Sequence, residues 1–220
     1  MTWHTMIWDA LFASRDWMAW NLFLALLPLG LSVWLFRQPK PRSVVWWVTA
    51  LVFVAFLPNA PYVLTDLIHL VEELQQTSSL FIGTLLLIPK YVVFVLIGWM
   101  AYVLSLINVG YYLKRQGLGR YILQMELLLH ALSAIGVYLG RFERLNSWNL
   151  VTHPHHVAVS LVENLLDHRP LILITLGFIG FTGLYWVFKE ITLALLLQRR
   201  YVRTLRQLSA NPEDYPSTLE

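Results

Sequence analysis

The chain has 220 residues, of which 57% are apolar and only 13% are charged, and its mean hydropathy is +0.58. Soluble domains contain about 45–50% apolar and about 25% charged residues, so charge has about half its usual share here. These values exclude an ordinary soluble enzyme and a disordered or fibrous chain. They predict an all-α fold: a polytopic membrane helix bundle of about five transmembrane helices, with amphipathic interfacial helices on its outer face.

The charges and the cysteine count exclude further classes. The chain has no cysteine, which rules out disulfides, cysteine-ligated metals and thiol nucleophiles. Its net charge is +3, yet no module that combines basic and aromatic residues occurs, and basic excess in a membrane protein belongs to cytoplasmic loops. We therefore expect no nucleic-acid partner.

Five apolar runs approach the roughly 20 residues that a helix needs to cross the hydrocarbon layer. In chain order they cover about Trp17–Phe36, Ser43–Leu57, Leu80–Leu113, Tyr121–Gly140 and Leu171–Phe188. The first 16 residues lack the features of a signal peptide, so the first run is expected to remain as a span. The third run is too long for a simple crossing, and its first part, Leu80–Ile88, is a candidate re-entrant or tilted piece before Pro89.

Basic residues set the expected orientation. If the five spans alternate, 11 of the 16 basic residues lie on one side, namely Arg37, Lys40, Arg42, Lys114, Arg115, Arg120, Lys189, Arg199, Arg200, Arg203 and Arg206. The positive-inside rule makes this side cytoplasmic, which leaves the N-terminus outside and the C-terminus inside. We expect a multi-pass protein of the bacterial inner membrane, with most acidic residues and histidines on the outer side.

The segment after the second span carries the first candidate site. Asn59 can cap a helix whose first turn contains Pro61, and on that helix Tyr62, Asp66, His69 and Glu73 would form one polar stripe. Asp66 and His69 are spaced for a carboxylate–imidazole pair, which is typical of acid–base catalysis. The alternative is an ordinary amphipathic interfacial helix.

A second candidate site follows the fourth span, where Arg141 and Arg144 place positive charge on the outer face. Guanidinium groups suit phosphate or carboxylate, so this segment is either an anion site or a clamp that pairs with acids of the first segment. Downstream, His153, His155 and His156 could hold a metal with Asp66 and His69, but no established zinc pattern occurs and no metal or other cofactor is expected.

Within the expected spans, Glu126 and His130 share a helix face. With Lys90 they could form a cluster for proton or ion movement, unless Lys90 reaches the outer interface. Gly136, Gly140, Gly177, Gly180 and Gly183 indicate close helix packing.

The C-terminal segment continues as a basic helix, on which Arg199, Arg203 and Arg206 would attract anionic lipid headgroups. We expect one helical membrane domain over residues 1–208 and a disordered cytoplasmic tail over 209–220.

Two motifs carry a resemblance that covers nearly the whole chain. The first is Pro58–Tyr62 with Thr65-Asp66 and His69, and the second is Gly140–Phe142 with Arg144 and Asn146–Trp148. They resemble an uncharacterised bacterial integral-membrane family known as a domain of unknown function. The resemblance implies a multi-span inner-membrane protein and brings no reaction, cofactor or substrate.

Together the two motifs favour a polar site on the outer face that binds or processes an anionic amphipathic or lipid-linked substrate. Asp66 and His69 would be its acid–base pair, Arg141 and Arg144 its anion clamp, and Asn59, Tyr62, Asn146, Ser147 and Trp148 its lining. Two alternatives stay open. One is a non-enzymatic assembly subunit with a membrane-protein partner, and the weaker one is a small transporter that uses Lys90, Glu126 and His130.

Overall fold

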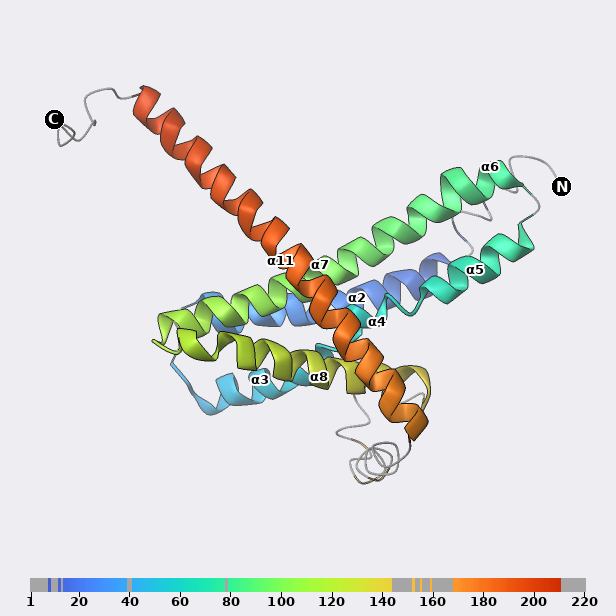
Figure 1. Cartoon of the computed structure of the whole chain (residues 1–220), viewed down its shortest axis with the longest axis horizontal. Coiled ribbons are helices and arrows are strands. Elements are labelled where there is room, and N and C mark those ends of the chain that lie inside the picture. The colour runs from blue at the N-terminus through green and yellow to red at the C-terminus, as the bar shows by residue number, and fades with distance from the viewer. Residues whose placement is uncertain are drawn as a thin grey trace.

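The computed structural model describes residues 14–38, 41–77, 79–143 and 168–210, the side chains of 204–210 excepted, and the single residues Trp8, Phe12, Thr152, His155 and Val159. The described residues form helices and turns and contain no strand. Five helical segments are long and apolar enough to cross a membrane. The predicted all-α bundle is therefore confirmed (Figure 1).

Helices α2 and α7 run side by side through the bundle (Figure 1). Helix α2 spans Arg15–Ser32 and continues as the π-helical turn η1, Val33–Arg37. Helix α7 spans Ile88–Arg115 and has Pro89 in its first turn. Their interface supplies much of the buried core, including Ala25, Leu35, Tyr91, Phe94 and Leu106.

The segment before α7 is helical as well. Helix α6 covers Leu80–Ile82, the π-helical turn η2 covers Gly83–Leu87, and α7 follows without interruption. Ser79 starts this run, because its Oγ accepts a hydrogen bond from the amide of Ile82. The re-entrant alternative for Leu80–Ile88 is therefore wrong. The wider turn η2 directly precedes α7, where Pro89 lacks an amide donor, so the helix can pass the proline.

The second span is a broken helix. Helix α3, Val44–Phe56, starts where the sequence predicted, and the Ser43 hydroxyl accepts from the Trp46 amide. The short helix α4, Asn59–Tyr62, follows, and turns over 63–66 separate it from α5, Leu67–Gln76. The single capped helix expected from Asn59 onward is wrong, since Asn59 is the first residue of α4 and its Nδ2 donates to the carbonyl of Phe56.

Helices α8 and α11 complete the bundle. The 3-10 turn η3, Gly119–Tyr121, leads into α8, Ile122–Arg141, which matches the predicted fourth span. Helix α11, His168–Ala210, packs on α8 and α7 and then extends beyond the bundle (Figure 1). The expected continuation of the last span as a basic helix is confirmed. The expected tail lies almost wholly outside the described residues and stays a prediction.

The α4 turn is wedged into the bundle at two glycines. A Cβ at Gly98 of α7 would lie 2.6 Å from Cγ2 of Val63, and one at Gly136 of α8 would lie 2.5 Å from Cγ of Pro58. Only glycine allows such an approach, so the packing role predicted for Gly136 is confirmed. The same prediction is wrong for Gly180 and Gly183, which have no neighbour within 4 Å of an added Cβ.

Candidate functional site

Asp66 is the centre of a polar cluster at the break between α4 and α5. Its carboxylate is almost fully buried, with Oδ2 accepting from Nδ2 of Asn21 at 2.9 Å. Its other oxygen, Oδ1, lies 3.7 Å from a guanidinium nitrogen of Arg141. Three elements thus meet at one carboxylate: the helix break, α2 and the end of α8. We refer to Asp66, Asn21 and Arg141 as the Asp66 cluster.

The helix break itself directs Asp66 into the bundle. Asp66 stands at the N-cap position of α5, yet its side chain makes no capping hydrogen bond. Because Pro58 and Val63 pack against glycines of α8 and α7, the turn that ends at Asp66 lies between these helices. A carboxylate buried there needs partners, and Asn21 and Arg141 provide a hydrogen bond and a positive charge.

The predicted partner of Asp66 is occupied elsewhere. Nδ1 of His69 lies 2.9 Å from Oε2 of Glu72, and the imidazole ring packs against Trp17 with centroids 5.0 Å apart. The remaining member of the predicted polar stripe, Glu73, accepts from Lys90 and Tyr91, each at 3.0 Å. Asp66 and His69 therefore share no hydrogen bond, although His69 still interacts electrostatically with the Asp66 carboxylate.

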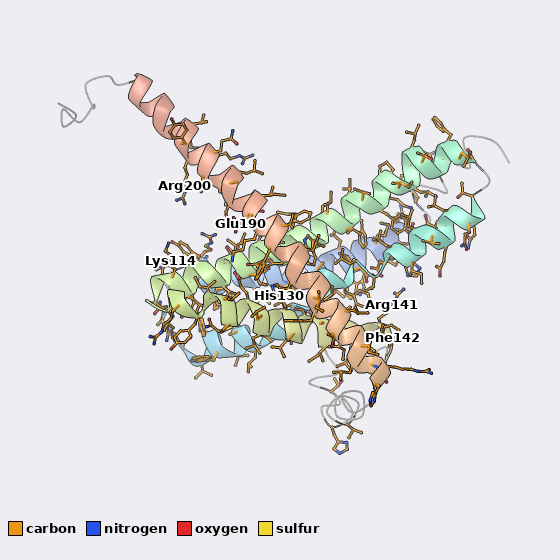
Figure 2. All side chains as sticks on the ribbon, viewed as in Figure 1. Lys114, His130, Arg141, Phe142, Glu190 and Arg200 are labelled. Carbon is orange, nitrogen blue, oxygen red and sulfur yellow. The ribbon has the colours of Figure 1, made fainter. Side chains whose placement is uncertain are left out.

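The other predicted site residues are placed as follows. Asn59 and Tyr62 are half-buried in α4, and Tyr62 packs against the core. Arg141 is a quarter exposed at the end of α8, far from Lys114 at the opposite end of the bundle (Figure 2). Arg144, Asn146, Ser147 and Trp148 lie outside the described residues. The structure thus joins Asp66 to Arg141, one of the two expected arginines.

The expected cluster of Lys90 with Glu126 and His130 has different partners in the structure. Lys90 donates to Glu73 and to Oγ of Ser14, near the start of α7. Glu126 is instead paired with Lys189 of α11, at an Nζ–Oε1 distance of 2.6 Å. The transporter alternative therefore loses the residue set on which it was based.

The pairing of Glu126 with Lys189 is the centre of a second polar cluster, which the sequence reading missed. Oε1 of Glu126 also accepts from the hydroxyl of Tyr185 at 2.7 Å. The Tyr185 ring packs on His130, whose Nδ1 lies 2.7 Å from the hydroxyl of Tyr102. Tyr185 and Lys189 lie one helical turn apart, and this spacing is the sequence feature that could have indicated the cluster. Lys189 was assigned to the cytoplasmic charges instead.

A metal site is not visible in the described part of the chain. No three His, Asp or Glu side chains there are grouped so that they could hold an ion. Of the histidine trio, His153 and His156 fall outside the described residues. The Asp66 cluster has one carboxylate, one amide and one guanidinium, which is the donor set of a structural ion pair or an anion site rather than of a metal centre.

These features define the class: an all-α protein with five helices suited to cross a membrane and buried ionic clusters inside the bundle. Within this class, the chain belongs to the family described as protein of unknown function DUF1361, whose pattern matches residues 20–182. The resemblance to a domain of unknown function is confirmed. Searches among curated proteins and solved structures find no match.

Proposed function

We propose that the chain is a multi-pass protein of the bacterial inner membrane that binds the anionic headgroup of a lipid or lipid-linked molecule at the outer end of α8. The observation that carries the proposal is the state of Arg141. Its guanidinium is a quarter exposed and is held at 3.7 Å from the buried Asp66, a distance too long for a hydrogen bond. The N–H donors of Arg141 thus stay available for a ligand.

The surroundings of Arg141 support an anion as that ligand. Among the described residues, Asp66 is the only partner of the Arg141 side chain. A guanidinium carries five N–H donors in a planar fork, which matches the oxygens of phosphate or carboxylate. Asp66 then holds the guanidinium in place, while its own two oxygens face Asn21 and Arg141.

The burial of Asp66 favours a binding role over acid–base catalysis for this carboxylate. A general base needs a carboxylate or imidazole that a substrate can reach. Asp66 is about 1% exposed, whereas the imidazole of His69, paired with Glu72, is 39% exposed. We therefore assign Asp66 a positioning role in the proposed site, with His69, Asn59 and Tyr62 beside it. Arg144, Asn146, Ser147 and Trp148 remain proposed lining residues.

Lipid retention by the purified full-length chain tests the proposal. Native mass spectrometry after incubation with phosphatidylglycerol and phosphatidylcholine of equal acyl composition measures the preference for an anionic headgroup. We expect the variant Arg141→Gln to lose about tenfold of that preference, since a charge-assisted contact contributes about 1.5–3 kcal/mol. The matched control is Arg15→Gln, which removes an exposed arginine paired with its neighbour Asp16. Equal retention by Arg141→Gln and wild type would contradict the proposal.

The proposed orientation has its own test, which the absence of cysteine makes straightforward. Gln76, at the end of α5, and Leu118, after α7, are exposed at opposite ends of the long helix Leu80–Arg115. We expect Gln76→Cys to react with a membrane-impermeant maleimide in intact spheroplasts. Leu118→Cys should react only after the membrane is opened. The reverse pattern would contradict an outside N-terminus.

The basic end of α11 is proposed as a contact for anionic lipids of the cytoplasmic leaflet. Arg199, Arg200 and Arg203 follow an apolar stretch and are exposed. A lipid surface attracts such arginines with about 1 kcal/mol each. Vesicle binding by a variant with Arg199, Arg203 and Arg206 changed to Gln should therefore fall most at low salt.

The alternative function is a non-enzymatic assembly subunit. It is favoured by α11 beyond the bundle, where the consecutive residues Leu195, Leu196 and Leu197 are 44–66% exposed and so present apolar surface around the helix. A discrete complex of fixed stoichiometry in mild detergent would support this alternative. A monomer that retains the anionic-lipid preference would support the binding function instead.

A further inference from the structure

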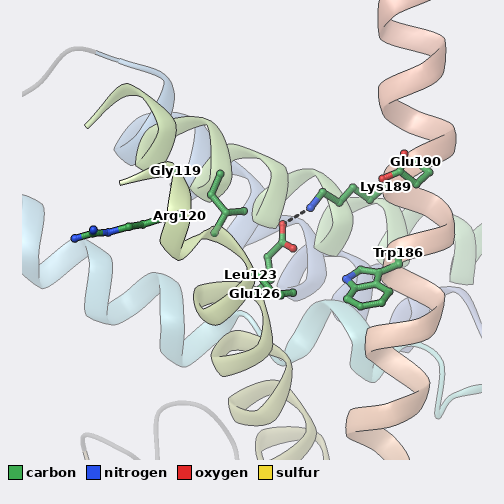
Figure 3. A pocket seen from close by; sticks show the side chains of 8 residues that line it. Gly119, Arg120, Leu123, Glu126, Trp186, Lys189 and Glu190 are labelled. Carbon is green, nitrogen blue, oxygen red and sulfur yellow. Dashed lines mark hydrogen bonds and ion pairs between the residues drawn. The ribbon is translucent and has the colours of Figure 1, made fainter. Parts of the chain in front are cut away.

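A second site lies at the other end of α8, where the η3 turn, α8 and α11 border an open cavity of about 450 Å³. Figure 3 shows the ion pair of Glu126 and Lys189 at this pocket, with Trp186 and Glu190 on α11. The Arg120 side chain on the η3 turn points away from this pair, and its guanidinium lies over the Tyr121 ring at 4.6 Å from the ring centroid. Gly119, Ile122 and Leu123 complete the lining. The site is independent of the outer site proposed above, since it uses none of the same residues.

Glu126 gives the cavity a hydrogen-bond acceptor with a negative charge. Its side chain is 4% exposed, and both of its hydrogen bonds, from Tyr185 and Lys189, end at Oε1. The second oxygen, Oε2, has no such bond from the described residues. The cavity therefore presents an acceptor suited to an N–H or O–H group of a ligand.

The charges around the cavity balance. Arg120 and Lys189 are positive, Glu126 and Glu190 are negative, and the formal sum is zero. A ligand that matches this lining has an anionic group for the arginine and lysine and a cationic donor for the free carboxylate oxygen. A ligand with only one kind of charge would leave half of the lining unmatched.

The cavity also has an apolar side. Trp186 is about half exposed, and Leu123 beside it is exposed as well. On α11, Ile179 lies two turns before Trp186 on the same helix face and is exposed, so an acyl chain can lie along this face. The basic residues Lys114 and Arg115 end α7 at the same side. A lipid of one leaflet can place its headgroup at the cavity and its acyl chains along the helices.

From these observations we propose that the cavity binds a phospholipid whose headgroup carries a phosphate and a primary ammonium. The phosphate contacts Lys189, and Arg120 reaches the phosphate once its guanidinium leaves the Tyr121 ring. The ammonium donates to Oε2 of Glu126. A quaternary ammonium has no N–H to donate, and an anionic glycerol headgroup has no positive charge for the carboxylates. The site should therefore prefer phosphatidylethanolamine to phosphatidylcholine and to phosphatidylglycerol.

Native mass spectrometry of the full-length chain with these three lipids, of equal acyl composition, tests the preference. We expect wild type to retain phosphatidylethanolamine about tenfold better than phosphatidylcholine, as a hydrogen bond between charged groups predicts. Glu126→Gln should lose this preference. The control Glu72→Gln, which changes an exposed carboxylate paired with His69 in α5, should keep it.

Two further variants keep the test decisive if Glu126→Gln fails to fold. The double variant Glu126→Gln with Lys189→Met leaves no unpaired charge in the bundle and should also lose the preference. Arg120→Gln should lower phosphatidylethanolamine retention about tenfold, whereas the control Arg115→Gln, outside the cavity lining, should not. Equal retention of phosphatidylethanolamine and phosphatidylcholine by wild type overturns the proposal. Competition by millimolar free phosphoethanolamine as strong as that by the lipid overturns the lipid as the ligand.

Discussion

The two ends of α8 carry the same chemistry in different settings. At Arg141, a buried carboxylate on the α4–α5 break faces a guanidinium at 3.7 Å and accepts from Asn21 through its second oxygen. Near the start of α8, Glu126 binds Lys189 at 2.6 Å through one oxygen and leaves the other without a hydrogen bond from the described residues. In the Asp66 cluster, the N–H donors of Arg141 remain available to the proposed ligand. In the Glu126 cluster, the carboxylate oxygen Oε2 remains available as an acceptor. The two proposed sites therefore differ in the ligand charge that they select.

The largest expected effect tests whether the Asp66 cluster holds the fold together. Asp66→Ala removes the partner of Arg141 and of Asn21 at a nearly buried position. Breaking a buried ion pair costs about 3–5 kcal/mol, and the part-exposed Arg141 places this cluster near the lower value. Unfolding of the detergent-solubilised protein followed by circular dichroism measures the loss. A change below about 1 kcal/mol would show that the cluster contributes little to stability.

The close packing of the α4 turn, here called the wedge, positions Asp66 and can be disturbed by a substitution that changes no charge. Gly136→Ala places a Cβ 2.5 Å from Pro58 and should destabilise by about 1–3 kcal/mol, because the packed turn has to shift. Gly180→Ala is the matched control, since its Cβ would meet no atom within 4 Å. The same unfolding measurement should find the control neutral or slightly more stable. Equal effects of the two changes would contradict the wedge.

A third prediction concerns a link between α7 and the α2–η1 segment that contains no carboxylate and belongs to neither ionic cluster. Asn108 donates to Oγ of Ser32 at 2.9 Å and accepts from Nε of Arg37 at 2.6 Å. Asn108→Leu should cost about 1–2 kcal/mol, as expected for hydrogen bonds between helices. Thermal unfolding, with Gln124→Leu at an exposed position of α8 as control, measures it. A loss of stability as large as that of Asp66→Ala would mean that the ion pair of Asp66 and Arg141 contributes no more than the hydrogen bonds of Asn108.

The smallest loss of stability is expected for the exposed pair of His69 and Glu72. The side chains of His69 and Glu72 are 39% and 55% exposed, so their pair should contribute less than about 0.5 kcal/mol. Glu72→Gln should leave the unfolding midpoint nearly unchanged at both low and high salt. A marked loss at low salt would show that this exposed pair contributes more than its exposure predicts.

The sequence predicted the helices well and their contacts poorly. Long apolar runs specify membrane-length helices almost by themselves, because every backbone group has to be paired within the helix. Thus the spans Ser43–Leu57 and Tyr121–Gly140 match α3 and α8 within one or two residues. By contrast, the sequence grouped Lys90 with Glu126 and assigned Lys189 to the cytoplasmic charges, since spacing along the chain does not say which helices pack together.

The candidate site shows the same limit at finer scale. Helical spacing placed Asp66 and His69 on one stripe, but that spacing holds only within an unbroken helix. Pro58 and Pro61 were visible in the sequence. Their effect depended on Gly98 and Gly136, which lie on other helices and let the turn enter the bundle. The break then turned Asp66 toward Asn21 and Arg141 and left His69 with Glu72.

By itself, then, the sequence determined that this is an all-α chain with five helices of membrane-spanning length, and it brought Arg141 forward as an unusual charge. Composition and hydrophobic runs suffice for that, because they are local properties of the chain. Only the tertiary structure decided which carboxylate meets which cation and which oxygen remains open to a ligand. Those outcomes depend on distances between helices, which local sequence patterns do not specify.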